Sequence, residues 1–185
     1  GGYYTVSIKT DGTLWAWGSG GYGQLGLGNK TNYSSPKQVG ALTNWLSVSC
    51  GQYHTLSIKT DGTLWSWGMN AYGQLGLGNT TNYSSPKQVG ALTTWSSVSC
   101  GGIHTVSIKT DGTLWSWGYN GSGQLGQGNT TSYSSPKQVG ALTNWSSVSC
   151  ITTYTVSIKT DGTLWAWGFN GYGNLGLNNT TNYSS

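Results

Sequence analysis

The 185-residue sequence contains no arginine and no glutamate, and its charged residues are eight lysines and four aspartates. Arginine is the main reader of guanine, and nucleic-acid-binding domains cluster Arg and Lys on one face. Four of the lysines stand beside an aspartate in a repeated turn, as Lys9 does beside Asp11, so their charges largely cancel although the formal net charge is +4. We therefore expect no specific nucleic-acid partner.

Long apolar runs are also absent. No stretch approaches the ~20 residues that a membrane-spanning helix needs, so we expect no membrane insertion. The low charge does not predict disorder, because 11 tryptophans and 12 tyrosines accompany the 31 glycines and supply apolar surface for a core. Nothing in the sequence indicates a cellular location.

Cysteine and histidine are scarce. Cys50, Cys100 and Cys150 recur at one position of a repeat. On neighbouring stacked sheets they would lie about 10 Å apart, whereas a disulfide needs Cα atoms within roughly 7 Å, so we expect buried, unpaired thiols. His54 and His104 fill a position that is Tyr in the outer units. We therefore expect no metal site and no cofactor.

What the sequence does contain is a repeat of 50 residues. "SIKTDGTLW" is identical at residues 7, 57, 107 and 157, and "YSSPKQVGALT" is identical at 33, 83 and 133. Such a period indicates a propeller or a solenoid. The chain is a single array, 1–185, of about 3.7 units: a partial unit, 1–35, and three full units, 36–85, 86–135 and 136–185.

Each unit is predicted to be a sheet of four antiparallel strands. Residues 54–59 alternate and are rich in β-branched side chains, and the following Asp-Gly favours a hairpin because it tolerates positive φ. Residues 63–68 and 95–100 are further strands, and 86–92, which begins with proline, suits a short edge strand. No stretch has a helical period, so the fold class is all-β.

Paired tryptophans are the expected core of this array. One small sheet cannot bury two Trp side chains, so neighbouring sheets must stack face to face with these residues between them. The predicted core residues are Trp15, Trp17, Trp65, Trp67, Trp115, Trp117, Trp165 and Trp167.

Two patterns that could support catalysis have structural explanations. Gly18-x-Gly20-x-x-Gly23 matches a dinucleotide-binding fingerprint, but no helix follows it and Asn replaces its middle glycine in the later units. The aspartates fall in equivalent hairpin turns rather than in one acid and base pair. We therefore expect no enzyme activity and no catalytic residues.

The stretch from Val48 to Leu92 closely resembles the regulator of chromosome condensation repeat. It carries, in order, Cys-Gly-x-x-His-Thr, a strand, Trp-Gly, Asn-x-x-Gly-Gln-Leu-Gly and a Pro-x-x-Val segment. The resemblance covers the whole chain and implies a β-propeller, commonly of about seven blades. Because this chain holds fewer units, it is either an excerpt of a longer chain or one of two chains that close a ring.

The near-identical units differ mainly in two windows, at 1–4, 51–54, 101–104 and 151–154, and at 19–22, 69–72, 119–122 and 169–172. Both windows follow strands that end on the same side of a blade, so we expect one rim rich in aromatic residues, which is a common form of binding surface. The candidate binding residues are Tyr3, Tyr4, Ser19, Tyr22, Tyr53, His54, Met69, Tyr72, Ile103, His104, Tyr119, Tyr154, Phe169 and Tyr172.

The sequence therefore favours a non-enzymatic propeller scaffold that binds a protein through this rim, with self-association, first of all into a dimer, to close the ring. Three alternatives remain: a structural protein that assembles into rings or fibres, a sugar-binding propeller, and a guanine nucleotide exchange factor. The last is implied by the family resemblance alone.

Overall fold

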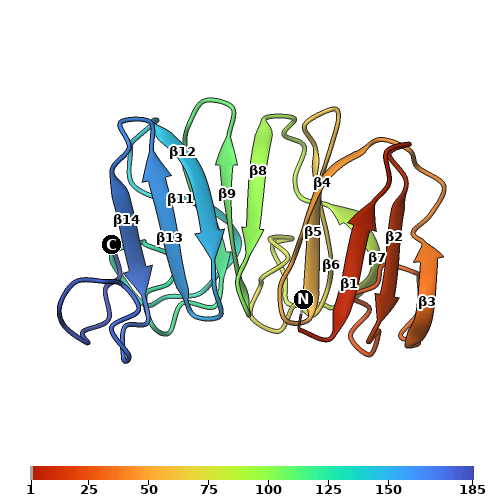
Figure 1. Cartoon of the computed structure of the whole chain (residues 1–185), viewed down its shortest axis with the longest axis horizontal. Coiled ribbons are helices and arrows are strands. Elements are labelled where there is room, and N and C mark those ends of the chain that lie inside the picture. The colour runs from red at the N-terminus through yellow and green to blue at the C-terminus, as the bar shows by residue number, and fades with distance from the viewer. Residues whose placement is uncertain (1) are drawn as a thin grey trace.

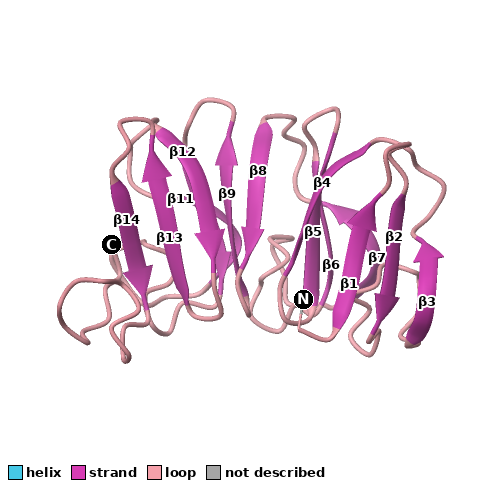
Figure 2. Ribbon diagram, viewed as in Figure 1, coloured by secondary structure: helices cyan, strands magenta, loops and turns pink. Residues whose placement is uncertain are grey.

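The computed structural model describes residues 2–185, which form fourteen β-strands and no helix (Figures 1 and 2). None of the described residues forms a helix long and apolar enough to cross a membrane. The strands are β1 (Tyr4–Ile8), β2 (Leu14–Gly18), β3 (Tyr33–Gln38), β4 (Trp45–Cys50), β5 (His54–Lys59), β6 (Leu64–Gly68), β7 (Tyr83–Gln88), β8 (Trp95–Cys100), β9 (His104–Lys109), β10 (Leu114–Gly118), β11 (Tyr133–Gln138), β12 (Trp145–Cys150), β13 (Tyr154–Lys159) and β14 (Leu164–Gly168).

These strands make four antiparallel sheets that stand side by side as blades (Figure 1). The two middle blades have the strand orders β4-β5-β6-β7 and β8-β9-β10-β11. Within residues 2–185 the first blade, β1-β2-β3, has no counterpart of β4, and the last, β12-β13-β14, has only the single bridge Gly168↔Tyr183 where β7 would lie. The predicted all-β class and four-stranded blades are confirmed. The blades begin and end at other residues than the sequence units 36–85, 86–135 and 136–185. A repeat of 50 residues fixes the length of a unit but not the residue at which a blade begins.

The predicted hairpin joins the two central strands of each blade. In the second blade Ile58 pairs with Leu64, and the amide of Gly62 donates to the carbonyl of Lys59 over 2.9 Å. Gly62 has a φ of +77°, whereas no aspartate has a positive φ. Only the glycine of the Asp-Gly pair therefore uses the left-handed conformation, which places it at the bulge of a longer turn rather than inside a two-residue turn.

The prediction for the fourth strand was wrong in its bounds. The outer strand β7 begins at Tyr83 and ends at Gln88, instead of covering residues 86–92. Its register on β6 shifts between the pairs Gly68↔Tyr83 and Ser66↔Lys87, and Pro86 lies in that irregular stretch. A proline without an N–H is tolerated there because the residue is at the sheet edge and makes no ladder bond.

The hydrophobic core lies between the blades rather than within any one of them. The first of three clusters combines Leu14 and Leu25 of the first blade with Trp45 and Trp67 of the second. Two equivalent clusters fill the next two joints, around Trp117 and Trp167. Face-to-face stacking of neighbouring sheets, as the Trp pairs predicted, therefore holds the array together.

The structure buries only some of the tryptophans that were predicted to form the core. The second Trp of each pair is buried where a blade precedes it: Trp67 and Trp117 are fully buried, and Trp167 is 3% exposed. The first Trp of each pair is only half-buried at 15, 65 and 115. Trp165 is 45% exposed, because within residues 2–185 no further sheet covers that face, and Trp17 is half-buried for the same reason on the first blade.

Candidate functional site

The two variable windows of each blade meet at one edge of the molecule. The amide of Ser19 donates to the carbonyl of Tyr3 over 3.0 Å, and the same bond joins Met69 to Tyr53 over 2.8 Å. The third and fourth blades repeat it, from Tyr119 to Ile103 and from Phe169 to Thr153, both over 3.0 Å. The windows therefore lie side by side along the lower edge in Figure 1.

Aromatic side chains contact one another along this edge and connect neighbouring blades. Tyr3 stacks on Tyr53 with ring centroids 5.9 Å apart, and Tyr22 contacts Tyr53 at 4.9 Å. Tyr72 meets Tyr119 edge to face at 5.0 Å. Several are exposed: Tyr3 by 63%, Tyr22 and Tyr72 by 43%, and Tyr172 by 88%. We call the following set the aromatic rim: Tyr3, Tyr22, Tyr53, Tyr72, Tyr119, Phe169 and Tyr172.

The charged side chains of the central hairpins lie at the edge opposite the rim. Strand β5 begins at the rim with His54 and ends at Lys59, and a six-residue strand spans about 17 Å. Lys59 and Asp61 therefore belong to the opposite edge, where the hairpin turns lie, and the other units repeat this arrangement. No aspartate or lysine falls in the two variable windows. The rim residues are consequently uncharged, with apolar rings and phenolic hydroxyls. In the first blade the exposed Lys30 lies near this edge, two residues before Asn32, whose side chain accepts from the amide of Gly20.

Three of the residues expected at the rim lie inside the molecule instead. Tyr4 is 4% exposed, and His54 and His104 are fully buried. Their side chains point from the first residue of a strand into the joint with a neighbouring blade, so they are not available to a partner at the surface. Tyr154 at the equivalent position is half-buried, as are Ser19, Met69 and Ile103.

These buried side chains connect the blades. Tyr4 Oη donates to the carbonyl of His54 over 2.5 Å, and Thr55 Oγ1 lies 2.9 Å from Tyr4 Oη. His54 Nε2 lies 3.2 Å from Thr105 Oγ1 of the next blade, and His104 Nε2 lies 3.0 Å from Thr155 Oγ1. Burial lowers the pKa of His54 to about 3 and that of His104 to about 4, so both rings are neutral at pH 7.

The glycine-rich loop also serves a joint between blades. The carbonyl of Gln24, in the loop after β2, accepts from Trp67 Nε1 and from Thr55 Oγ1, over 2.9 and 2.8 Å. Gly26 has a φ of +74°, and a Cβ there would come within 2.8 Å of Trp67 Nε1. Gly26 thus allows the loop to approach the tryptophan closely. The last glycine of the Gly18-x-Gly20-x-x-Gly23 pattern is structural in the same way, because Gly23 has a φ of +82° and a Cβ there would come within 2.6 Å of Ser84 Cα in the next blade.

The aspartates cap the hairpin turns. Asp61 Oδ1 accepts from the amide of Thr63 over 3.0 Å and from Thr63 Oγ1 over 2.6 Å, and Trp65 Nε1 donates to the same threonine oxygen over 2.9 Å. The hydrogen bonds from Thr63 lower the pKa of the Asp61 carboxyl. The other three aspartates repeat these bonds.

The three thiols are unpaired, and burial raises the pKa of each. Cys100 is buried as expected, whereas Cys50 and Cys150 are only half-buried at the mouth of a cavity between the first strands of the last three blades. Within residues 2–185 no three His, Cys, Asp or Glu side chains are grouped so that they could hold a metal ion.

A third set of tryptophans, which was not among the predicted core residues, is also buried. Trp45, Trp95 and Trp145 begin the first strands of the last three blades and are between 3% and 6% exposed. Trp95 packs edge to face on Trp115 and Trp117, with centroids 6.2 and 5.9 Å apart. Their recurrence every 50 residues could have predicted that they are buried. Each has Ser and Thr residues within two positions of it, however, and such a polar segment does not indicate a buried strand.

Comparisons with known proteins agree with this architecture. The chain superposes on human WBSCR16 with a TM-score of 0.88 at 24% identity, over 98% of this chain and 49% of that one. It superposes on yeast RCC1 (Prp20) bound to Kap60 with a TM-score of 0.86 at 22% identity, over 98% and 45%. It also superposes on Prp20p from Saccharomyces cerevisiae, described with its binding properties to Gsp1p and histones. The TM-score is 0.88 at 22% identity, over 98% of this chain and 47% of that one.

The chain thus spans about half of the length of these solved structures, and the likeness shows the propeller fold. The pattern of the regulator of chromosome condensation (RCC1) repeat matches residues 11–58, 61–108, 111–158 and 161–185, and a second description of the same repeat matches 45–74 and 95–124. The chain belongs to the regulator of chromosome condensation (RCC1) repeat family.

Proposed function

We propose that this chain is a non-enzymatic propeller scaffold that binds a protein through the aromatic rim. The observation that carries the proposal is the contact of exposed aromatic side chains from neighbouring blades, Tyr3 and Tyr22 with Tyr53, and Tyr72 with Tyr119. Tyrosine buries a large area at low entropic cost, and it is enriched where binding energy concentrates. The rim is mounted on strands whose sides are buried in the joints, so its rings are held in place before a partner arrives.

The relatives support a protein as the partner. One structure holds yeast RCC1 (Prp20) with Kap60, and another concerns the binding of Prp20p to Gsp1p and histones. The lack of charge on the rim of this chain favours a partner segment that is also uncharged and apolar. Strongly basic histones fit less well, since the chain itself has a formal net charge of +4.

The proposal is tested by selecting binders from an unbiased library of displayed 12-residue peptides and mapping where they bind. The rim variant replaces Tyr3, Tyr22 and Tyr53 by serine. The matched control replaces Thr10, Thr60 and Thr110 by alanine, three exposed positions in the hairpin turns at the opposite edge. We expect the selected peptides to lose at least tenfold in affinity for the rim variant, because hot-spot aromatics contribute about 2 kcal/mol or more each.

Their affinity for the control is expected to stay within twofold of that of the original chain. Peptides that bind both variants equally well would refute the rim as the binding surface. Near-UV and far-UV circular dichroism of the rim variant checks that its blades are intact.

End-to-end self-association is a second candidate, and exposed residues of the outer blades favour it. Leu164 is 67% exposed, whereas Leu14, Leu64 and Leu114 at the same position are fully buried. Asn174 is exposed at the position where Gln24 accepts from Trp67. On the first blade Thr5 is exposed and Trp17 is half-buried. A second copy stacked on this face could repeat the internal joint, with Trp17 and Thr5 donating to the carbonyl of Asn174.

Light scattering over a range of concentrations tests this second candidate. We expect a mass above that of one chain, and we expect Leu164→Lys to return it to 19.6 kDa. Leu46→Lys is the control, because Leu46 is similarly exposed, at 61%, and its counterparts in the next two blades are Ser96 and Ser146. A monomer at all concentrations would exclude self-association and leave the rim proposal untouched.

A further inference from the structure

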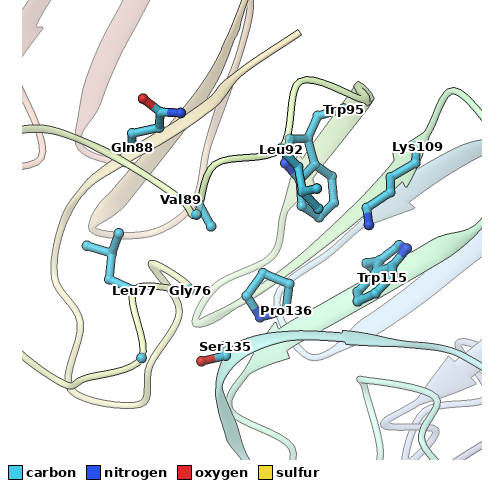
Figure 3. A pocket seen from close by; sticks show the side chains of 12 residues that line it. Gly76, Leu77, Gln88, Val89, Leu92, Trp95, Lys109, Trp115, Ser135 and Pro136 are labelled. Carbon is cyan, nitrogen blue, oxygen red and sulfur yellow. The ribbon is translucent and has the colours of Figure 1, made fainter.

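A cavity of about 390 Å³ lies at the joint between the second and third blades, toward the edge opposite the aromatic rim. Figure 3 shows Lys109, Trp115 and Pro136 converging on it, with Leu92 beside Trp95 and with Leu77 and Val89 on the other side. The walls are therefore mainly apolar. A volume of this size accommodates a small organic molecule.

Lys109 supplies a cation to this apolar cavity. The side chain is only 8% exposed, and Nζ stands over the ring of Trp115, 3.6 Å from its centroid, and 5.0 Å from that of Trp95. Among residues 2–185 no carboxylate forms an ion pair with this ammonium, and no hydrogen-bond acceptor is paired with it. Burial lowers the pKa of Lys109, an effect that a bound anion would counter.

The ring of Trp95 lines the same cavity, whereas its N–H lies below the surface. Trp95 is 3% exposed, and its Nε1 is buried without a hydrogen-bond acceptor. An unpaired buried N–H costs free energy comparable to a lost hydrogen bond, but a ligand in the cavity cannot reach this nitrogen, so Trp95 contributes an apolar ring to the wall. Trp65, Trp67, Trp115 and Trp117 all donate to oxygen atoms, so the lack of a partner distinguishes Trp95 and its equivalents from the other tryptophans of these two blades.

The same arrangement recurs at the first joint. A cavity of about 390 Å³ is lined there by Leu42, Trp45, Trp65 and Pro86, and Lys59 Nζ lies 3.7 Å from the ring centroid of Trp65. Trp45 Nε1 again has no acceptor. At the third joint the cavity is smaller, about 160 Å³. Trp165, which forms part of its wall, is exposed to solvent.

We propose that the joints between blades are binding sites for small carboxylates that carry an apolar ring or chain, with one site at each of the two complete joints. The carboxylate would accept from the lysine ammonium, and the apolar body would contact the Leu, Val and Pro walls. The unpaired polar group is a cationic donor, which favours an anion over a cation or a neutral donor. A sugar acid fits less well, because its hydroxyls would be buried against apolar walls.

This inference is independent of the proposed scaffold function. The cavity is formed by residues at the hairpin ends of the strands, such as Trp95, Lys109 and Trp115, whereas the rim lies at the opposite ends. Loss of binding at one surface therefore leaves the other open to measurement.

Isothermal titration calorimetry with three probes tests the proposal on the full chain. Phenylacetate has the predicted chemistry, 2-phenylacetamide replaces its charge by a neutral amide, and glucuronate keeps the charge but replaces the apolar body by hydroxyls. We expect phenylacetate to bind with a stoichiometry of two and both other probes to bind at least tenfold more weakly, because a charge-assisted hydrogen bond is lost in one and apolar contact in the other.

The double variant Lys59→Met and Lys109→Met keeps the apolar stems and removes both cations. It is expected to weaken phenylacetate at least tenfold, whereas the control, Lys37→Met and Lys87→Met, changes lysines of the outer strands and leaves binding unchanged. Lys109→Met alone, which removes the cation from one of the two joints, should lower the stoichiometry to one. Equal binding of phenylacetate and 2-phenylacetamide, tighter binding of glucuronate, full binding by the Lys59 and Lys109 variant, or no binding of phenylacetate up to 10 mM would each overturn the proposal.

Discussion

Gly76 lies where the loop of one blade touches the tryptophan of the next. Its φ is +73°, and a Cβ would come within 2.8 Å of Trp117 Nε1, which is fixed by its bond to the carbonyl of Gln74. We expect Gly76→Ala to lower the free energy of unfolding by about 2–4 kcal/mol, from the unfavourable φ and the displaced indole together.

Gly90→Ala separates these two causes. Gly90 has a similar φ of +62°, but nothing lies within 4 Å of the position its Cβ would take. The control should therefore cost about 1 kcal/mol, the effect of φ alone. Urea unfolding followed by tryptophan fluorescence measures both variants, and equal losses would contradict the close approach.

The two buried histidines predict an acid-sensitive fold. Burial lowers their pKa values to about 3 and about 4 in the folded chain, below the 6.5 of an exposed imidazole. Between these pH values the unfolded chain therefore binds protons that the folded chain does not bind. The free energy of unfolding is consequently at its full value above about pH 6.5 and falls as the pH drops toward 4. With both rings contributing, the free energy of unfolding should drop by about 2–3 kcal/mol per pH unit in that window.

The outer units supply the control for this pH dependence, because Tyr4 and Tyr154 occupy the histidine position. We expect the double variant His54→Tyr and His104→Tyr to fold and to show a much flatter profile between pH 4 and pH 6.5. A steep profile in this variant would assign the acid sensitivity to other groups.

At the scale of elements, the joints between blades depend on one threonine in the strand that follows each variable window. Thr105 Oγ1 of β9 donates to the carbonyl of Gln74 over 2.9 Å and lies 3.2 Å from His54 Nε2, so it connects its strand to two segments of the preceding blade. Thr105→Val keeps the shape and removes both contacts. We expect a loss of about 1–3 kcal/mol in unfolding free energy, because buried polar groups are left unpaired.

Thr5 is the matched position in the first blade, where it is exposed. Thr5→Val should change stability by less than about 0.5 kcal/mol, as surface substitutions usually do. Similar losses for the two variants, measured by urea unfolding under the same conditions, would show that the joint does not depend on this hydrogen bond.

Some of the strands could be predicted from the sequence more exactly than others. Alternation in 54–59 and the Asp-Gly turn gave the central hairpin correctly, because these signals are local. The start of the outer strand at Tyr83 could not be derived, since Ser84, Ser85 and Pro86 have weak strand preferences and lie between the pairs that join β7 to β6. The carbonyl of Ser84 accepts instead from the amide of Gly28 in the preceding blade, over 2.8 Å. The burial of His54 was missed for a related reason: it depends on a neighbouring blade, not on the residues beside it.

At the scale of the whole molecule, each blade is stabilised mainly by its neighbours. The three core clusters all combine residues of two successive blades, and a blade in the middle of the array is covered on both faces. The rim and the cavities at the joints are consequences of the same stacking, because each takes side chains from two blades. The period of 50 residues predicted this arrangement, and the variable windows predicted where aromatic residues would gather.

The most direct test of the scaffold account is the hydrogen-exchange footprint of a selected peptide on the full chain. The amides of Met69 and Tyr119 are bonded to Tyr53 and Ile103 beneath the rim, so a partner seated there should slow exchange in residues 51–54, 69–72 and 119–122. The account predicts protection of these segments with no change in the hairpin turns at 60–62 and 110–112. Protection of the turns with an unchanged rim would contradict it.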